Sequence, residues 1–213
     1  MHALPHAPAA EQNKRPILNA IRMRLRDVGL LLEIGSGSGQ HGEFFAAALA
    51  DECPKLRWQP SELPEQLPGL AERVRRSGLG NLLPPLALDL RRADWPIEGC
   101  DACYTCNTLH IVAWAEVRAL FVGAAARLPV GGELLIYGPF LDDAAPADGG
   151  LGRGSAASNL AFDRALRQAD PQRGVRQLAE LRRLGAECAL ELVEIIELPR
   201  DNQLLVFRRT AGA

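Results

Sequence analysis

Leu30-Leu31-Leu32-Glu33-Ile34-Gly35-Ser36-Gly37-Ser38-Gly39-Gln40-His41-Gly42 is the stretch that decides the fold of this chain. Its apolar beginning has the length of a buried strand, and the strand ends around the acidic residue Glu33. Glycines then follow at alternate positions, and a helical pattern starts at Glu43. A strand that stops in glycine and restarts as a helix brings bare backbone close to a ligand and directs helix-terminal N–H groups towards it. The stretch therefore predicts a nucleotide-type cofactor site.

Two cofactor types compete for these glycines. Gly37, Gly39 and Gly42 have the G-x-G-x-x-G spacing of dinucleotide-binding folds, but the first of them comes three residues after the strand, which is late for a tight turn. Glu33, followed by glycines at 35, 37 and 39, matches instead the E/D-x-G-x-G-x-G signature of class I S-adenosylmethionine-dependent methyltransferases. A carboxylate would repel a pyrophosphate, whereas S-adenosylmethionine (SAM) carries an amino group and a sulfonium but no phosphate. We therefore favour SAM and keep NAD as the alternative.

Size and composition limit the function classes. The chain has 213 residues, of which 47% are hydrophobic, and this predicts one domain spanning 1–213. The net charge is −2, with acidic and basic residues interspersed, so we expect no nucleic-acid partner. No apolar run has the length of a membrane span, and residues 1–8 lack the apolar region of a signal peptide. We expect a soluble cytoplasmic protein that does not bind membranes, and the sequence does not indicate its oligomeric state.

The five cysteines form no paired framework, which fits a reducing compartment. Cys100, Cys103 and Cys106 are spaced like metal ligands, and His110 follows them. However, the segment 101–106 has the pattern of a buried strand, and residues three apart on a strand point to opposite faces. Cys103 and Cys106 are therefore not expected to converge on one ion. We predict small buried thiols and no metal site.

Strand-like and helix-like segments alternate along the chain, which predicts a doubly wound parallel sheet. The predicted strands are Leu30–Ile34, Leu56–Pro60, Leu86–Leu90, Asp101–Cys106 and Glu133–Tyr137. The predicted helices are Ala10–Leu25, which we expect to begin mainly near Pro16 and to form an N-terminal cover (about 10–26), a helix that ends near Ala50, Pro68–Arg76 and Ala113–Leu128.

The last two predicted strands have a different connection. Leu190–Leu198 and Gln203–Arg208 are joined by a segment far too short for a helical crossover, so they must be antiparallel. A mostly parallel seven-stranded sheet that ends in an antiparallel C-terminal hairpin is typical of class I methyltransferases. This observation does not depend on the glycine motif, and it predicts the Rossmann-like class I methyltransferase fold.

An insertion (about 141–184) separates the fifth strand from this hairpin. Its beginning, Asp142–Ser155, is rich in Gly, Ala and Asp and is predicted to be a mobile loop. Ser158 is predicted to cap a helix over 159–168, and a further helix is expected over 175–184. Because insertions at this place lie over the ligand crevice, we expect residues 142–176 to form a lid. The alternative is a helix that packs on the sheet behind an inert loop.

Several segments together resemble one class I methyltransferase family, the methyltransferase-like 26 group, also known as domain-of-unknown-function family 938 (DUF938). The matching segments are 9–18, 32–41, Trp58–Ser61, Leu86–Asp89, Asn107–Ile111, Tyr137–Phe140, Ser158-Asn159-x-x-Phe162-Asp163, Asp170-Pro171, Gly174-x-Arg176 and 202–207. The resemblance covers nearly the whole chain and implies SAM as the cofactor far more firmly than it implies a substrate. Glu62 stands where we expect Asp after the second strand, and the two residues have equivalent roles.

The class I arrangement assigns one cofactor contact to each strand end. Glu62 is expected to accept hydrogen bonds from the ribose hydroxyls, Asp89 to accept one from the adenine amino group, and Asn107 to face the methionine portion. The full set of predicted cofactor-binding residues is Glu33, Gly35, Ser36, Gly37, Gly39, Glu62, Leu63, Asp89, Leu90 and Asn107.

Methyl transfer by in-line displacement needs mainly alignment and, for some nucleophiles, a base. His110 is the candidate catalytic base or substrate contact, with a purely structural histidine as the alternative. The predicted substrate-binding residues are Asn13, Tyr137, Asn159 and Asp163, of which the last two lie one helical turn apart. Lys14 could lie over the cofactor or on a solvated helix face.

The chain after the fourth strand, Asn107-Thr-Leu-His110, lacks the Pro-Pro-aromatic sequence of amino-methylating enzymes. With no basic patch either, a small molecule is the expected substrate. The sequence thus predicts a SAM-dependent methyltransferase. An NAD-dependent oxidoreductase and a non-catalytic SAM-binding protein remain as alternatives.

Overall fold

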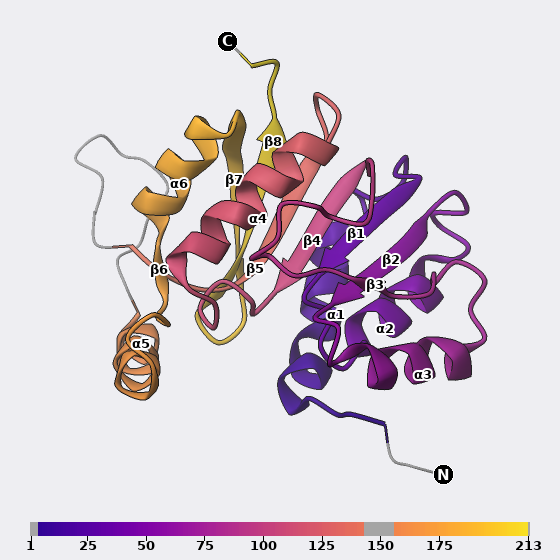
Figure 1. The fold of residues 1–213 in the computed structure, drawn as a ribbon, viewed down its shortest axis with the longest axis horizontal. Coiled ribbons are helices and arrows are strands. Elements are labelled where there is room, and N and C mark those ends of the chain that lie inside the picture. Colours follow the sequence, from indigo (N-terminus) through magenta and orange to yellow (C-terminus); the bar gives the residue numbers. More distant parts are fainter. Residues whose placement is uncertain (1–3, 143–155, 213) are drawn as a thin grey trace.

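One mixed sheet organises the computed structural model, which describes residues 4–142 and 156–212. The strands follow the order β3-β2-β1-β4-β5-β8-β7, and β6 pairs with β5 outside this path (Figure 1). The strands are β1 (Leu30–Ile34), β2 (Arg57–Glu62), β3 (Leu86–Ala87), β4 (Ala102–Cys106), β5 (Glu133–Leu141), β6 (Arg176–Gln177), β7 (Leu190–Leu198) and β8 (Asn202–Arg209).

The first five strands pair in parallel, whereas β8 runs antiparallel to both of its neighbours, β5 and β7. A short turn joins β7 to β8, and two of its residues, Arg200 and Asp201, have positive φ angles of 64° and 55°. Two successive residues with positive φ give a turn whose twist matches that of a hairpin. The predicted doubly wound, mostly parallel sheet with an antiparallel C-terminal hairpin is therefore confirmed.

Helices cover both faces of the sheet (Figure 1). One core cluster joins α4 and α6 to residues such as Cys103, and the other joins α1 and α2 to residues such as Tyr104, so neighbouring residues of β4 serve opposite faces. The helices are α1 (Pro8–Ile21), α2 (Gln40–Leu49), α3 (Leu67–Ser77), α4 (Trp114–Arg127), α5 (Ala157–Ala169) and α6 (Leu178–Glu187).

The chain leaves β1 and continues to β2 on one side, but β4 lies on the other side of β1. Such a reversal of strand order opens a crevice beyond the carboxyl ends of the strands, where open α/β sheets bind ligands. The glycine-rich segment follows β1 directly at this edge. The fold thus places the segment at the expected ligand crevice.

Four local predictions need correction. Helix α1 begins at Pro8 and contains Pro16, because Pro8 fits the first helical turn and the burial of Ile17 and Ile21 holds the later turns in place. Strand β3 ends at Ala87, because Asp89 begins a turn by accepting the backbone N–H of Arg92.

Helix α5 begins at Ala157 with Ala156 as its N-cap, so Ser158 is not the cap; its hydroxyl donates instead to Asp201 Oδ2 at 2.5 Å. The short strand β6 precedes α6, and the predicted helix over 175–184 therefore begins later, at Leu178. Most of the predicted loop Asp142–Ser155, and with it the core of the predicted lid, lies outside the described residues.

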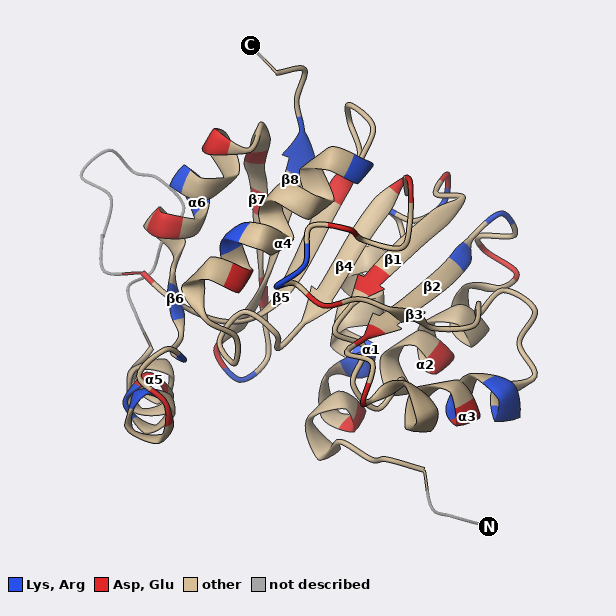
Figure 2. Cartoon of the chain, viewed as in Figure 1, with Lys and Arg blue, Asp and Glu red and all other residues tan. Residues whose placement is uncertain are grey.

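Acidic and basic side chains alternate over the ribbon, as Figure 2 shows, and many of them are paired. None of the helices in residues 4–142 and 156–212 combines the length and the apolar character that crossing a membrane requires.

Candidate functional site

The loop after β1 takes its shape from glycines with positive φ angles, 73° at Gly35, 53° at Gly37 and 75° at Gly39. Side-chain-bearing residues rarely adopt this conformation. A Cβ atom at Gly37 would meet no atom within 4 Å, so this glycine borders open space. A Cβ atom at Gly39 would lie 2.5 Å from Leu70 Cδ1. Gly39 therefore serves the contact of this loop with α3 and is not among the residues that line the adjacent cavity; its role as a cofactor contact stays a prediction.

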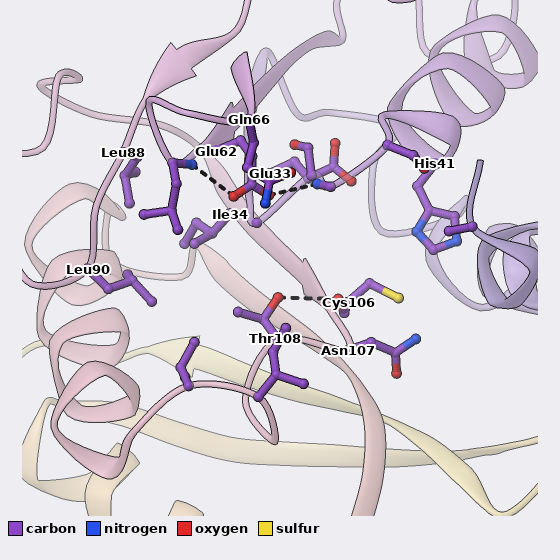
Figure 3. A pocket seen from close by; sticks show the side chains of 18 of the residues that line it. Glu33, Ile34, His41, Glu62, Gln66, Leu88, Leu90, Cys106, Asn107 and Thr108 are labelled. Atoms are coloured by element: carbon purple, nitrogen blue, oxygen red, sulfur yellow. Dashed lines mark hydrogen bonds between the residues drawn. The ribbon is translucent and has the colours of Figure 1, made fainter. Parts of the chain in front are cut away.

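A cavity of about 450 Å³, here called the glycine-loop cavity, opens beside Gly37 (Figure 3). In this view Leu88 and Leu90 lie on one side, His41 lies on the other, and Glu33 and Glu62 lie between them. Nine predicted cofactor residues line the cavity: Glu33, Gly35, Ser36, Gly37, Glu62, Leu63, Asp89, Leu90 and Asn107. The strand ends thus bring to one cavity residues that are up to 74 positions apart in the chain.

The charge of the glycine-loop cavity is one-sided. Its lining includes four carboxylates, from Glu33, Glu62, Asp89 and Glu116, and among the described lining residues there is no Lys or Arg. Such a surface repels phosphate and attracts a cationic ligand. The charge therefore disfavours a dinucleotide and suits a sulfonium compound that carries an ammonium group.

Glu62 already takes part in the architecture of the loop. Its Oε2 accepts the backbone N–H of Gly37 at 2.8 Å, and its Oε1 accepts that of Leu63 at 2.8 Å. Each carboxylate oxygen can accept a further hydrogen bond, so both remain available to hydroxyl donors of a ligand. The N–H of Gly37, which in a dinucleotide fold would be available to a phosphate, is occupied.

Asp89 lies further along the same wall. Its carboxylate accepts hydrogen bonds from the side chain of Arg91, at 2.7 Å from Nη2, and from the Arg91 backbone N–H at 3.0 Å. The bond from the Arg91 side chain is the main reason why the pKa of Asp89 is lowered. Asp89 is thus held ionised, and a ligand amino group would share it with Arg91.

Glu33 is only 2% exposed, although it borders the glycine-loop cavity. Burial raises its pKa to about 7, against the opposing effects of hydrogen bonds from Trp58 and Ser36. The Trp58 indole N–H donates to Glu33 Oε2 at 2.8 Å. A carboxyl group with such a pKa changes its charge near neutral pH and responds to a nearby cation.

The start of α1 joins this site through a buried polar pair. Asn13 Oδ1 lies 2.7 Å from His41 Nε2, and the His41 ring stacks on Phe45. Burial lowers the pKa of His41 to about 4, so the ring is neutral and donates no charge to the cavity. Ala7, Ala9 and Ala10 complete the wall on this side.

A second cavity of about 460 Å³ adjoins the first and reaches the β7–β8 turn; we call it the hairpin cavity. Ala9 and Asn107 line both cavities. Asn107 has a φ of 55°, and its N–H donates to the Tyr137 carbonyl at 2.9 Å. A non-glycine residue in this conformation is uncommon and is often found at functional sites. Asn107 thus marks the junction at which two ligands would meet.

The hairpin cavity collects the candidate base and three of the four predicted substrate residues, namely His110, Asn13, Tyr137 and Asn159. His110 is 7% exposed, and burial, reinforced by the charge of Arg176, lowers its pKa to about 4. Its ring meets that of Phe162 edge to face, with centroids 5.2 Å apart. No protein group within residues 4–142 and 156–212 hydrogen-bonds to this ring, so a neutral imidazole is left for a ligand.

Arg176 holds the loop that carries His110. Its Nε donates to the Leu109 carbonyl at 2.9 Å, and its Nη2 donates to the Val112 carbonyl. The Arg176 side chain is itself buried. Arg176 therefore positions His110 through the backbone on both sides of it.

Two candidates lie elsewhere. Asp163 borders neither cavity, because its carboxylate accepts the Val175 N–H at 2.8 Å and pairs with Arg167. Its role as a substrate contact stays a prediction. Lys14 pairs with Glu11 and lies over the ring of Phe44, away from both cavities. The amide nitrogen of Asn159 bonds the carbonyls of Phe140 and Asp201, which leaves its oxygen free to face a ligand.

Sequence reasoning missed further lining residues of the hairpin cavity: Gln12, Ser158, Phe162, Arg200 and Asn202. Phe162 and Asn202 lie in segments that carry the family resemblance, and this resemblance could have indicated them. Arg200 had none, because its place depends on how the terminal hairpin docks.

The thiols follow the predicted alternation. Cys103 packs in the core beside α4, and Cys106 packs against the core on the other face. Cys100 Sγ lies 3.4 Å from Cys103 Sγ, and all five cysteines are free. The described residues contain no group of three or more His, Cys, Asp or Glu arranged to hold a metal ion.

Several solved structures with the same fold carry the name methyltransferase. An O-methyltransferase family protein from Burkholderia thailandensis is 16% identical, with a TM-score of 0.74 over 96% of this chain and 58% of its own. Human N-acetylserotonin methyltransferase, solved with SAM, is 16% identical, with a TM-score of 0.74 over 95% of this chain and 53% of its own. An O-methyltransferase family 2 protein from Planctomyces limnophilus, solved with apigenin, is 22% identical, with a TM-score of 0.67 over 94% of this chain and 62% of its own.

At these identities the similarity shows the fold, and the chain spans little more than half the length of these proteins. A family model covers almost all of the sequence. It is described as "Protein of unknown function (DUF938)" and matches residues 4–209, so the chain belongs to the DUF938 family.

Proposed function

We propose that this protein is a SAM-dependent methyltransferase that acts on a small molecule. The observation that carries the proposal is the lining of the glycine-loop cavity, with four carboxylates and, among its described residues, no Lys or Arg. The solved methyltransferases of the same fold support this assignment.

SAM fits the residues present. Glu62 would accept hydrogen bonds from the ribose hydroxyls, Asp89 would accept one from the adenine amino group, and Glu33 and Asn107 would face the methionine end. Gly37 would allow close approach, because nothing fills the space beside it. Leu63 and Leu90 would contribute apolar contact at the same wall. When bound, SAM supplies a methyl group on a positively charged sulfur.

The acceptor would occupy the hairpin cavity and meet the methyl group at Asn107. The chemistry that SAM would supply there is transfer of its methyl group to a lone pair of the acceptor, with sulfur keeping the electrons of the broken bond. For a hydroxyl acceptor, whose oxygen becomes strongly acidic on methylation, the neutral imidazole of His110 would be a sufficient proton acceptor. Asn13, Tyr137 and Asn159 would orient the acceptor.

The five free thiols are compatible with a cytoplasmic reaction. The test is methyl transfer from labelled SAM to a library of small metabolites, read as S-adenosylhomocysteine (SAH) release by the full chain. Transfer that stops when the glycine loop is altered is the expected result. SAH binding without transfer to any compound would favour the non-catalytic SAM-binding alternative, and binding of NAD in place of SAH would overturn the proposal.

A further inference from the structure

The hairpin cavity has a charge opposite to that of its neighbour. Among its described lining residues, Arg200 is the one with a permanent charge, and no Asp or Glu lines it. The one histidine of this lining, His110, adds no charge, because burial keeps it neutral. A small anion is therefore the ligand whose charge this cavity complements.

Arg200 is held at the cavity edge from two directions. Its backbone belongs to the β7–β8 turn, which Asn159 anchors to α5 by donating to the Asp201 carbonyl at 2.8 Å. Its guanidinium reaches α1, where Nη1 donates to Gln12 Oε1. The guanidinium thus spans the space between the turn and α1 at the cavity.

The charge of Arg200 has no carboxylate partner within the described part of the chain. Other arginines, such as Arg24, Arg118 and Arg208, form ion pairs with glutamates. The side chain that Arg200 contacts, Gln12, is a neutral amide. The adjacent Asp201 carboxylate accepts the Ser158 hydroxyl at 2.5 Å and does not line the cavity. Nε and Nη2 of Arg200 therefore remain available to bind a planar anion through two parallel hydrogen bonds.

The interior of the cavity is built to hold a ligand. His110 is more than nine-tenths buried, and its ring nitrogens meet no hydrogen-bonding partner among the described residues. Phe162, which is 40% exposed, offers a ring face beside it. Burial raises the pKa of Tyr137 to about 12, against the hydrogen bond from Asn13 and, more weakly, the charge of Arg200.

We infer that the methyl acceptor is a small carboxylic acid whose carboxylate binds Arg200 and whose nucleophilic atom points towards His110 and Asn107. This inference rests on the proposed function and adds the substrate class and orientation to it. Arg200 acts as a specificity-determining residue, because it lies at the turn end of the cavity, away from the junction with the glycine-loop cavity.

The experiment measures equilibrium binding of matched compounds to the full chain, with and without SAH. Each set of compounds keeps one hydroxyl group and varies a second group, which is a carboxylate, a primary amide or an amine. The first set is 4-hydroxybenzoate, 4-hydroxybenzamide and 4-hydroxybenzylamine, and further sets have aliphatic hydroxy compounds in place of the aromatic ones. We expect the best carboxylate to bind at least about tenfold more tightly than its amide. Arg200→Gln should remove this preference, Arg200→Lys should restore part of it, and Arg118→Gln, an exposed arginine on α4, should keep it.

Three outcomes would overturn the inference: equal binding of carboxylate and amide, a preference that survives in Arg200→Gln, or no carboxylate bound at all. SAH affinity, measured on the same proteins, separates this test from the proposed function. Carboxylate binding through Arg200 without any SAH binding would overturn the proposed function alone. SAH binding without a carboxylate preference would overturn the assignment of Arg200 alone.

Discussion

The backbone N–H of Gly37 donates a 2.8 Å hydrogen bond to Glu62 Oε2, which ties the end of β2 to the loop that follows β1. The bond occupies a loop N–H group and places a negative charge beside it. Both effects disfavour a phosphate at this position and leave carboxylate oxygens free for hydroxyl donors. This relationship distinguishes the loop from a dinucleotide-binding one.

Glu62→Ala should weaken SAH binding by about 1–3 kcal/mol, the scale of a hydrogen bond to a charged group. Titration calorimetry measures the change. Glu65→Ala is the matched control, because Glu65 is exposed nearby and borders neither cavity. Equal affinities of the two variants would show that Glu62 does not hold the ribose.

Gly37→Asn should remove SAH binding while the protein remains folded. Asparagine tolerates a positive φ better than most residues, and its side chain would enter the open space beside the loop. A variant with Val would confuse the result, because β-branched residues are strained at a φ of 53°.

Gly78→Asn is the control for this change. Gly78 has a φ of 65°, also with no atom within 4 Å of an added Cβ, but it ends α3 outside both cavities. Thermal unfolding should show similar, small losses of stability for both variants, and calorimetry should show lost binding for Gly37→Asn alone. Retained SAH binding in Gly37→Asn would show that this loop does not contact the ligand.

Glu33 predicts a pH dependence of stability. Its pKa is raised from 4.5 to about 7, so between these values the folded protein holds a proton that the unfolded chain has released. The contribution of Glu33 to the free energy of unfolding therefore falls as the pH rises through this window. His41 and His110, whose pKa values are lowered from 6.5 to about 4, contribute the opposite slope over an overlapping range, so the measurement compares wild type with Glu33→Gln by urea unfolding. A difference that does not change between pH 5 and 7 would contradict the assignment.

The same group links pH to cofactor binding. The sulfonium and ammonium charges of SAM favour the ionised form of Glu33, so SAM affinity should increase as the pH rises towards and past 7. Glu33→Gln should make the affinity nearly independent of pH over this range. A wild-type affinity that falls with rising pH would contradict a cation beside Glu33.

His110→Phe should lower turnover by about 10²–10⁴-fold while SAH affinity stays unchanged, because the ring shape is kept and the proton acceptor is lost. The rate is measured with any acceptor found in the library. Turnover at the wild-type rate in this variant would show that His110 is a structural residue and not the base.

Local patterns predicted much of the fold and of the cofactor site. Strand β1 and its glycine loop are encoded in consecutive residues, and Glu62, Asp89 and Asn107 each follow a strand whose end lies at a known edge of a parallel sheet. The packing of Gly39 could not be predicted, because the residue that crowds it, Leu70, belongs to another helix. A spacing motif does not distinguish a glycine that faces a ligand from one that faces a neighbouring helix.

Longer-range packing places residues that local patterns could not. Asp163 matched the pattern of a polar face on α5, but its carboxylate accepts the N–H of Val175, which lies beyond the end of that helix. Arg200 carried no signal in the sequence, because the docking of the hairpin against α1 and α5 is what brings it to the cavity. Pro16 was taken as a helix boundary, yet the burial of Ile17 and Ile21 outweighs the lost hydrogen bond.

Titration calorimetry of the full chain with SAH and, separately, with NAD tests the central claim most directly. The carboxylate-lined cavity beside Gly37 predicts one SAH bound per chain and no heat from NAD under the same conditions. NAD binding in the absence of SAH binding would contradict the account.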